Sequence, residues 1–487
     1  MSTNKSNIIS HASIYTLGTI LKRSVSLIML PIYTRYLTPA DYGVVELLSM
    51  LLDFATIIFS ARVGQAVFRY YCTAHSEAEK KCTIASALLL SILLNGLGTI
   101  IVILLAGPLA IAVFSDVTYK EYIALFAITM FLAPMIELPL TYIRAEQKPW
   151  LFLTFSAMKL AFQLSLNIYL VVYLEMHVEG VIYSAVISGL IMSTILMIYV
   201  LPRTGIRASL DTSRKLFTFS LPLKLATFGS FYMAFGDRYI LNIFTDLSQV
   251  GIYSLGYKFG FILLLLAWDP FQMMWDSEKY KIHKEPDAVF IYQKVFLYIS
   301  SALIFAGLCI SLFTEDLLRI MADPDFLDAY KVVPIVIIAY IFQAWTRYCN
   351  FGILLKDKTV HIAYAEALGV LAITAAYFTL IPLYGMYGAA WSTVIGFIVR
   401  FYWTNRKGTQ LYDMGLPWNK VGLTSTLAIS IYFLSILAPD EIISSILFRS
   451  ALAILFLVVF FVMPILTSKE KMEIWNKIRS MNGMLGS

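Results

Sequence analysis

The chain has 487 residues, of which 59% are apolar and 14% are charged, and its mean hydropathy is +0.76. Soluble domains carry roughly 45–50% apolar and about 25% charged residues, so this composition indicates an integral membrane protein. At about 20 residues per helical span, the length accommodates roughly a dozen or more transmembrane helices and leaves no room for a separate soluble domain. The net charge of +6 is spread along the chain, which argues against nucleic acid as a partner.

Long apolar runs between polar breaks predict an all-α polytopic fold with fourteen transmembrane helices. The lipid interior offers the backbone no hydrogen-bond partners, so each run is expected to be helical. In chain order, the predicted spans are 12–34, 43–67, 83–106, 121–143, 150–174, 178–201, 216–241, 249–275, 288–313, 331–355, 360–382, 385–403, 420–438 and 444–466.

Lysine and arginine are concentrated in one of the two sets of connecting loops. More than half of the 37 basic residues fall in the N-terminus, every second loop and the C-terminus, whereas the opposite loops are rich in acids. The positive-inside rule therefore places both termini in the cytoplasm. We expect a multi-pass protein of the bacterial cytoplasmic (inner) membrane.

A weak internal repeat relates the two halves of the chain at a spacing of 208 residues. Gly251 follows Gly43 at this distance, and the segment 180–188 (GVIYSAVIS) aligns with 388–396 (GAAWSTVIG). An even number of spans per repeat predicts two six-helix lobes in parallel orientation, related by an axis along the membrane normal. The predicted organisation is an N-terminal lobe over 1–202, a cytoplasmic linker over 203–215, a C-terminal lobe over 216–405, and a final helix pair with a cytoplasmic tail over 406–487. Independent small-residue packing faces are the alternative explanation of the matching segments.

Charged residues inside the predicted spans are the most informative feature, because they are costly in lipid and usually face a cavity or a partner. Lys294, Arg400 and Arg449 lie near span ends, so we expect these three to reach the interface by snorkelling. The deeper cations are Lys22, Arg23, Arg62, Lys159, Lys224, Lys258 and Arg347, and the acids are Asp53, Glu137, Asp237, Asp269 and Glu366.

Two explanations are open for these charges. In the first, acids neutralise the cations in buried pairs that hold helices together, as we expect for Lys258 with Asp269 and for the adjacent Asp237 and Arg238. In the second, the cations line a water-filled cavity between the lobes, where uncompensated positive charge attracts an anionic ligand. Lys22 and Arg23 favour the second explanation, since neighbours on one helix would need two partners at the same depth.

Patterns typical of enzymes or metal sites are weak in this sequence. The four cysteines and five histidines show no metal-ligand spacing, and there is no Walker A sequence. Ser156 and Lys159 match an S-x-x-K pattern, but they lie inside a predicted span without the companion motifs of that enzyme class. We therefore expect a transporter without a cofactor or metal, and not an enzyme.

Three segments resemble the multidrug/oligosaccharidyl-lipid/polysaccharide (MOP) exporter superfamily, and within it the polysaccharide-biosynthesis flippases of the O-antigen (Wzx) type. They are LPIYTRYLTPADYG at 30–43, RAEQKP at 144–149 and DRYIL at 237–241. The resemblance implies a central cavity that opens alternately to the two sides of the membrane. It also implies a cargo, an oligosaccharide on undecaprenyl diphosphate, that moves from the inner to the outer leaflet during lipopolysaccharide, capsule or exopolysaccharide synthesis.

A diphosphate is an anion, so the resemblance agrees with the cationic cavity inferred from the residues. The predicted diphosphate contacts are Lys22, Arg23, Arg62 and Arg347, with Lys159 and Lys224 as secondary candidates. Asp53, Asp269 and Glu366 are the candidate sites of a coupling ion. We expect a monomer in the bilayer, with a glycan polymerase and a chain-length regulator as candidate protein partners.

Three alternatives stay open at this point. A drug or cation exporter of the same superfamily should have a cavity rich in acids and aromatic residues, against which the core cations argue. A lipid II flippase for cell-wall synthesis is not distinguished by the sequence. A glycan polymerase or ligase usually carries a large outer loop, whereas the longest predicted here covers only residues 314–330.

Overall fold

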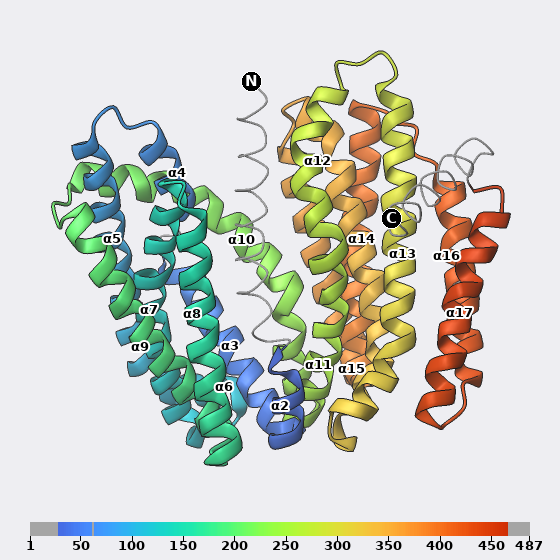
Figure 1. Ribbon diagram of the computed structural model, residues 1–487, viewed down its shortest axis with the longest axis horizontal. Coiled ribbons are helices and arrows are strands. Elements are labelled where there is room, and N and C mark those ends of the chain that lie inside the picture. Colours follow the sequence, from blue (N-terminus) through green and yellow to red (C-terminus); the bar gives the residue numbers. More distant parts are fainter. Residues whose placement is uncertain (1–27, 61–62, 466–487) are drawn as a thin grey trace, which may run out of the picture. The chain divides into compact units, whose positions relative to one another are not determined.

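The computed structural model describes residues 28–60 and 63–465, apart from the side chains of 222–226, and every regular element in these ranges is helical. Figure 1 shows the helices in their chain order. Up to residue 244 they are α2 (Leu30–Tyr36), α3 (Pro39–Phe59), α4 (Gly64–Cys72), α5 (Glu77–Leu104), α6 (Ala106–Phe114), the short η1 (Val117–Tyr119), α7 (Lys120–Ala145), α8 (Pro149–Asn167), the π-helical η2 (Ile168–Tyr173), α9 (His177–Thr204) and α10 (Leu210–Phe244).

The remaining helices lie between residues 247 and 462. They are α11 (Leu247–Leu263), the π-helical η3 (Leu264–Trp268), α12 (Asp269–Ile282), α13 (Ala288–Met321), the short η4 (Pro324–Phe326), α14 (Ala329–Leu355), α15 (Val360–Leu411), α16 (Trp418–Leu434), the short η5 (Ser435–Leu437) and α17 (Ile442–Val462). Ten helices in the described part are long and apolar enough to cross a membrane.

The helices confirm the predicted all-α membrane fold, with local differences. The predicted span 43–67 is divided between α3 and α4, while 249–275 is one continuous run through α11, η3 and α12. Two predicted spans, 360–382 and 385–403, form the long α15, which is interrupted at Gly385. Gly385 has φ 54° and ψ −129°, a conformation that glycine adopts without the steric cost of a side chain. Most of the first predicted span lies outside the described residues.

The chain divides into two compact units. The first contains the described residues up to Ser254 together with Thr374–Ala389, and the second contains Leu255–Ile373 and the described residues from Ala390 onward. In the first unit, α7 packs between α5 and α9, and α8 packs on α9. Side chains such as Val67, Ile84 and Phe152 form its buried core. The lobe boundary predicted at the linker 203–215 stays a prediction.

In the second unit, α13 packs against α14 and against both helices of the C-terminal pair. Its core is rich in aromatic side chains. Trp275 of α12 stacks on Tyr348 of α14 with ring centroids 5.1 Å apart, and Tyr292 of α13 meets the edge of Trp275 at 5.9 Å. Offset and edge-to-face pairs of this kind add to the stabilisation that burial of the rings provides.

Side chains at equivalent positions of the repeat cap the N-termini of α3 and α11. At the start of α3, Thr38 and Asp41 form a reciprocal capping box with both hydrogen bonds at 3.1 Å, and Pro39 occupies the first helical position. At the start of α11, the Asp246 carboxylate accepts a hydrogen bond from the Gln249 backbone N–H at 2.8 Å. Asp246 follows Thr38 by 208 residues, so the two caps occupy matching positions.

The first turns of α3 and α11 cross in direct backbone contact, and all the residues involved belong to the first unit. A Cβ atom on Gly43 would lie 2.1 Å from the Leu247 carbonyl oxygen, and one on Gly251 would lie 1.9 Å from the Pro39 carbonyl oxygen. Only glycine permits this approach. Leu247 follows Pro39 by 208 residues, as Gly251 follows Gly43, so exchanging the repeats maps the contact onto itself. This reciprocal contact confirms the predicted repeat.

The second pair of matching segments also has equivalent packing. A Cβ atom on Gly180 would lie 3.1 Å from the Leu170 carbonyl oxygen, and one on Gly388 would lie 2.2 Å from the Leu380 carbonyl oxygen. Each glycine therefore lets its helix begin against the end of the preceding one. The matching segments therefore show both close packing through small residues and equivalent positions in the repeat.

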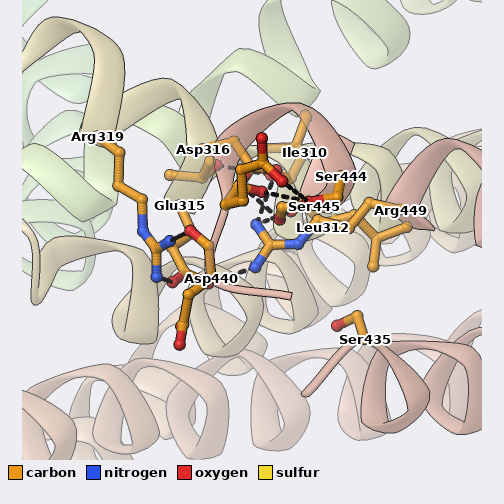
Figure 2. A network of polar contacts seen from close by, with 12 residues as sticks. Ile310, Leu312, Glu315, Asp316, Arg319, Ser435, Asp440, Ser444, Ser445 and Arg449 are labelled. Atoms are coloured by element: carbon orange, nitrogen blue, oxygen red, sulfur yellow. Dashed lines mark hydrogen bonds and ion pairs between the residues drawn. The ribbon is translucent and has the colours of Figure 1, made fainter. Parts of the chain in front are cut away.

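A buried polar network fastens the C-terminal helix pair to α13 (Figure 2). Arg449 of α17 lies 2.5 Å from the Glu315 carboxylate and 3.0 Å from the Asp316 carboxylate of α13, and it donates a hydrogen bond to the Leu312 carbonyl. Ser445 donates a further hydrogen bond to Asp316 at 2.8 Å. The Arg449 side chain is only 7% exposed. The snorkelling predicted for Arg449 is therefore wrong, because a pair of acids on a neighbouring helix binds the guanidinium.

Candidate functional site

The first unit encloses a cavity of about 810 Å³ among α3, α4, α5, α7, α8 and α9. Helix α7 contributes much of the wall and contains Pro134 and Pro139 within its length. A proline inside a helix removes one backbone hydrogen bond and bends the helix, which is tolerated at membrane depth where the freed backbone is buried in protein or lines a cavity. Glu137 lies between the two prolines in the sequence, and it lines the cavity.

Four charged side chains line the cavity, two of each sign: Asp53 of α3, Glu137 and Arg144 of α7, and Lys159 of α8. Arg144 lies over the rings of Phe68 and Phe152 at 5.2 and 5.5 Å, which favours a fixed position at the C-terminal end of α7. Among the described groups that face the cavity, positive and negative charges are therefore balanced.

Lys159 is a partly buried cation of this wall. No ion pair or hydrogen bond of its ammonium group is present among the described residues, although Glu137 lies near enough to attract it. Of the predicted diphosphate contacts, Lys159 is thus placed in a polar cavity by the structure. The adjacent Ser156 donates to the Phe152 carbonyl at 2.7 Å, as a helix-packing serine does, which agrees with the rejection of the S-x-x-K pattern.

Three primary amides on the same wall have unused hydrogen-bonding capacity, and the sequence analysis did not identify them. Asn95 of α5 is 2% exposed and donates to the Ser91 carbonyl at 2.8 Å, but its Oδ1 has no partner within the described residues. The side chains of Gln65 and Gln163 make no hydrogen bond there either. By contrast, the buried Asn167 accepts from both Tyr33 and Ser184. The only sequence signal for these amides is that they interrupt apolar spans.

Two of the predicted cations of the second unit, Arg347 and Arg400, are paired with acids. Arg347 of α14 lies 3.7 Å from the Asp269 carboxylate and donates to the Gln272 side chain at 3.1 Å. Arg400 lies 3.0 Å from the Glu366 carboxylate, and both side chains are largely buried. Snorkelling was therefore a wrong prediction for Arg400 as well. Whether Arg347, Asp269 and Glu366 contact a ligand or ion stays a prediction.

The remaining predicted residues fall into two groups. Lys22, Arg23 and Arg62 lie outside the described residues, as does the side chain of Lys224. Asp237 and Arg238 form the expected buried pair at 2.8 Å, and the Tyr253 hydroxyl donates to the second Asp237 oxygen at 2.5 Å. Within the described part, no three histidines, cysteines or acids gather in a way that could hold a metal ion.

Solved structures of membrane transporters share the fold of this chain. A lipid II flippase, MurJ, in an inward closed conformation is 14% identical, with a TM-score of 0.69 over 92% of this chain and 98% of the other. A multidrug resistance MATE family transporter of the MOP superfamily is also 14% identical in its inward-facing conformation, with a TM-score of 0.63 over 83% and 98% of the two chains. In its outward-facing conformation such a transporter has a TM-score of 0.51, again at 14% identity, over 82% and 96%.

The sequence comparisons concern the family. No curated protein matches the chain. The polysaccharide biosynthesis protein family matches residues 8–272, which is more than half of the sequence. The match includes the three segments on which the resemblance was based and all the helices around the cavity. The chain is thus a multi-pass membrane protein that belongs to the polysaccharide biosynthesis protein family.

Proposed function

We propose that the protein is a flippase that moves an oligosaccharide linked to a polyprenyl diphosphate from the cytoplasmic to the outer leaflet. The proposal depends chiefly on Lys159, a cation without an ion pair among the described residues, in a polar cavity of a polysaccharide biosynthesis family member. An ionisable residue inside a membrane helix is costly, and it commonly marks a path for substrate or ions.

The diphosphate headgroup dominates the energetics of moving such a cargo. Its charges lose their hydration in the bilayer core, which is strongly unfavourable unless cationic groups and hydrogen-bond donors replace the water. The ammonium group of Lys159 offers three donors and a full charge for this purpose. The proposed headgroup contacts are those predicted from the sequence, namely Lys22, Arg23, Arg62 and Arg347, with Lys159 and Lys224.

Among the three candidate ion-coupling acids, Asp53 is favoured by its place in the structure. It lines the same cavity as Lys159, whereas Asp269 and Glu366 belong to the second unit. Membrane potential alone supplies about 2.3 kcal/mol per charge per 100 mV, so coupling to an ion is a separate hypothesis. Flipping by the wild type that is indifferent to proton and sodium gradients would dismiss it, whereas gradient dependence that disappears in Asp53→Asn would support it.

The proposed setting is the inner membrane of a bacterium, with both termini in the cytoplasm. The excess of Lys and Arg on one set of loops supports this orientation. The protein would act as a monomer. It would deliver its cargo to a glycan polymerase and a chain-length regulator on the outer side, which assemble O-antigen, capsule or exopolysaccharide.

A lipid II flippase is the second candidate, since the MurJ structure shares the fold over 92% of this chain. The two candidates differ in the glycan and not in the carrier chemistry. A multidrug exporter also shares the fold, but Lys159 and Arg144 balance the two acids of the cavity, which is unfavourable for a cationic drug.

Reconstituted vesicles test the proposal directly. The purified protein is placed in proteoliposomes with undecaprenyl-diphosphate-linked oligosaccharide, and transfer between leaflets is followed by the fraction that an added glycosidase can reach. We expect protein-dependent transfer that falls at least tenfold in Lys159→Met and is partly retained in Lys159→Arg. Lys81→Met removes an exposed lysine outside the cavity and should transfer like the wild type.

The possible results separate the candidates. Equal transfer by Lys159→Met and the wild type would remove Lys159 from the site. No transfer of this lipid, together with transfer of lipid II, would favour the second candidate, and export of a cationic dye without lipid transfer would favour the multidrug exporter.

A further inference from the structure

The cavity of the first unit contains more hydrogen-bonding capacity than an anion requires. Besides Lys159, the Asn95 Oδ1 atom and the side-chain amides of Gln65 and Gln163 have no hydrogen-bond partner within the described residues. The Glu137 carboxylate also accepts no hydrogen bond there. Of these groups the Asn95 Oδ1 atom is buried, and buried polar groups in native proteins are nearly always satisfied, so this atom requires a polar occupant or ordered water. Gln163 is half-buried, while Gln65 and Glu137 are accessible on the wall and can contact a polar occupant directly.

The chemical types on the wall distinguish between classes of occupant. A phosphate accepts hydrogen bonds only, so it can use the cations but leaves the carboxylates of Asp53 and Glu137 without a donor, while an apolar molecule would leave the amides unsatisfied. A sugar hydroxyl both donates and accepts, so a saccharide can use carboxylates, amides and an ammonium group together. The rings of Phe68 and Phe126 on the same wall offer apolar contact for the C–H face of a pyranose.

The size of the cavity agrees with this class. Its volume of about 810 Å³ lies within the range of roughly 300–1,000 Å³ that is typical of small-molecule sites. It therefore holds a small saccharide but not a long oligosaccharide. The sugar nearest the diphosphate is the part of the cargo that would be tethered beside Lys159.

We propose that this cavity binds the carrier-proximal sugar of the lipid-linked cargo, with the Gln163 amide and Asn95 Oδ1 as its specificity-determining contacts. The inference rests on the proposed flippase function and adds a binding site for the saccharide to it. Gln163 extends from α8 one turn after Lys159, and Asn95 extends from α5, so the sugar would be held between two helices while Lys159 contacts the adjoining phosphate.

Binding measurements on the full-length protein in nanodiscs test this site. The probes are undecaprenyl diphosphate, the same lipid with one N-acetylhexosamine, and the same lipid with one hexose. We expect the wild type to bind at least one glycosylated probe about tenfold more tightly than the bare lipid, in line with one or two well-formed hydrogen bonds. Gln163→Met keeps the length of the side chain, and it should abolish most of this preference while leaving the affinity for bare lipid unchanged.

Two further variants secure the test. Asn95→Leu should also weaken the binding of glycosylated lipid. Since the Gln163 side chain makes no hydrogen bond within the described part, Gln163→Met should not impair folding. Gln410→Met replaces an exposed glutamine far along the sequence in α15 and should behave like the wild type. Thermal unfolding of each variant confirms that it is folded.

The outcomes distinguish this inference from the proposed function. Equal affinity of the wild type for bare and glycosylated lipids would overturn the saccharide site and leave the diphosphate proposal intact. A sugar preference that survives both Gln163→Met and Asn95→Leu would place the sugar elsewhere and also overturn it. Folded wild-type protein that binds none of the three lipids would contradict the flippase function itself.

Discussion

Replacing Arg449 by methionine should release the C-terminal helix pair from α13. Arg449 neutralises both Glu315 and Asp316, and after its removal Glu315 keeps a second partner, Arg319, at 2.6 Å. Within the described residues Asp316 then keeps only the hydroxyl of Ser445, and its side chain is 3% exposed, so its charge is left almost uncompensated. Removing one partner of a buried ion pair typically costs about 3–5 kcal/mol.

The thermal unfolding temperature of the purified protein and the protease sensitivity of the α16–α17 segment measure this effect. We expect Arg449→Met to unfold at a clearly lower temperature and to be cleaved first near α17. The control Arg406→Met removes an exposed arginine and should be neutral. Combining Arg449→Met with Asp316→Asn should recover most of the loss, because the second change removes the unpaired charge. Equal unfolding temperatures for Arg449→Met and Arg406→Met would refute the reasoning.

Three further predictions concern other parts of the chain. Gly43→Ala places a Cβ atom 2.1 Å from the Leu247 carbonyl oxygen, so it should destabilise the protein by roughly 1–3 kcal/mol or more in thermal unfolding. The control Gly422→Ala meets nothing within 4 Å and should be neutral or stabilising. Equal shifts in unfolding temperature for the two variants would contradict the close crossing of α3 and α11. Gly385→Ala forces a positive φ on alanine and should lower the unfolding temperature, and an unchanged value would argue against the break in α15. At the C-terminal end of α7, burial raises the pKa of the Glu146 carboxyl, but hydrogen bonds from Tyr71 and Lys148 outweigh it and hold that pKa below its ordinary value. The stabilisation that the ionised Glu146 provides is therefore present above the unfolded-state pKa of about 4.3, and it is lost as the pH falls through the lower folded-state pKa. A plot of unfolding temperature against pH should accordingly be flatter for Glu146→Gln than for the wild type. Identical plots for the two proteins would exclude the effect.

The transmembrane helices could be predicted because a lipid environment demands long apolar runs with internally satisfied backbones. The predicted spans 83–106 and 444–466 accordingly correspond to α5 and α17 with small shifts at their ends. The repeat was also visible in the sequence, since Gly43 and Gly251 are required by a backbone contact that no larger residue permits.

The partners of the charged residues could not be predicted, because they depend on how each helix is rotated and packed. Arg449 lies near a span end, where snorkelling is the usual behaviour, yet its acids come from a helix more than a hundred residues earlier. The amides of the cavity were missed for a related reason. Gln65, Asn95 and Gln163 each interrupt a separate span, and only the packing of α4, α5 and α8 brings them to one wall.

Native mass spectrometry of the protein purified from its membrane tests the central claim most directly. The wild type should retain a lipid whose mass corresponds to polyprenyl diphosphate carrying one or more sugars, and Lys159→Met should retain at least tenfold less of it than Lys81→Met does. If the wild type carries only phospholipids, or if both lysine variants hold the glycolipid equally, then the cavity of the first unit does not bind the cargo.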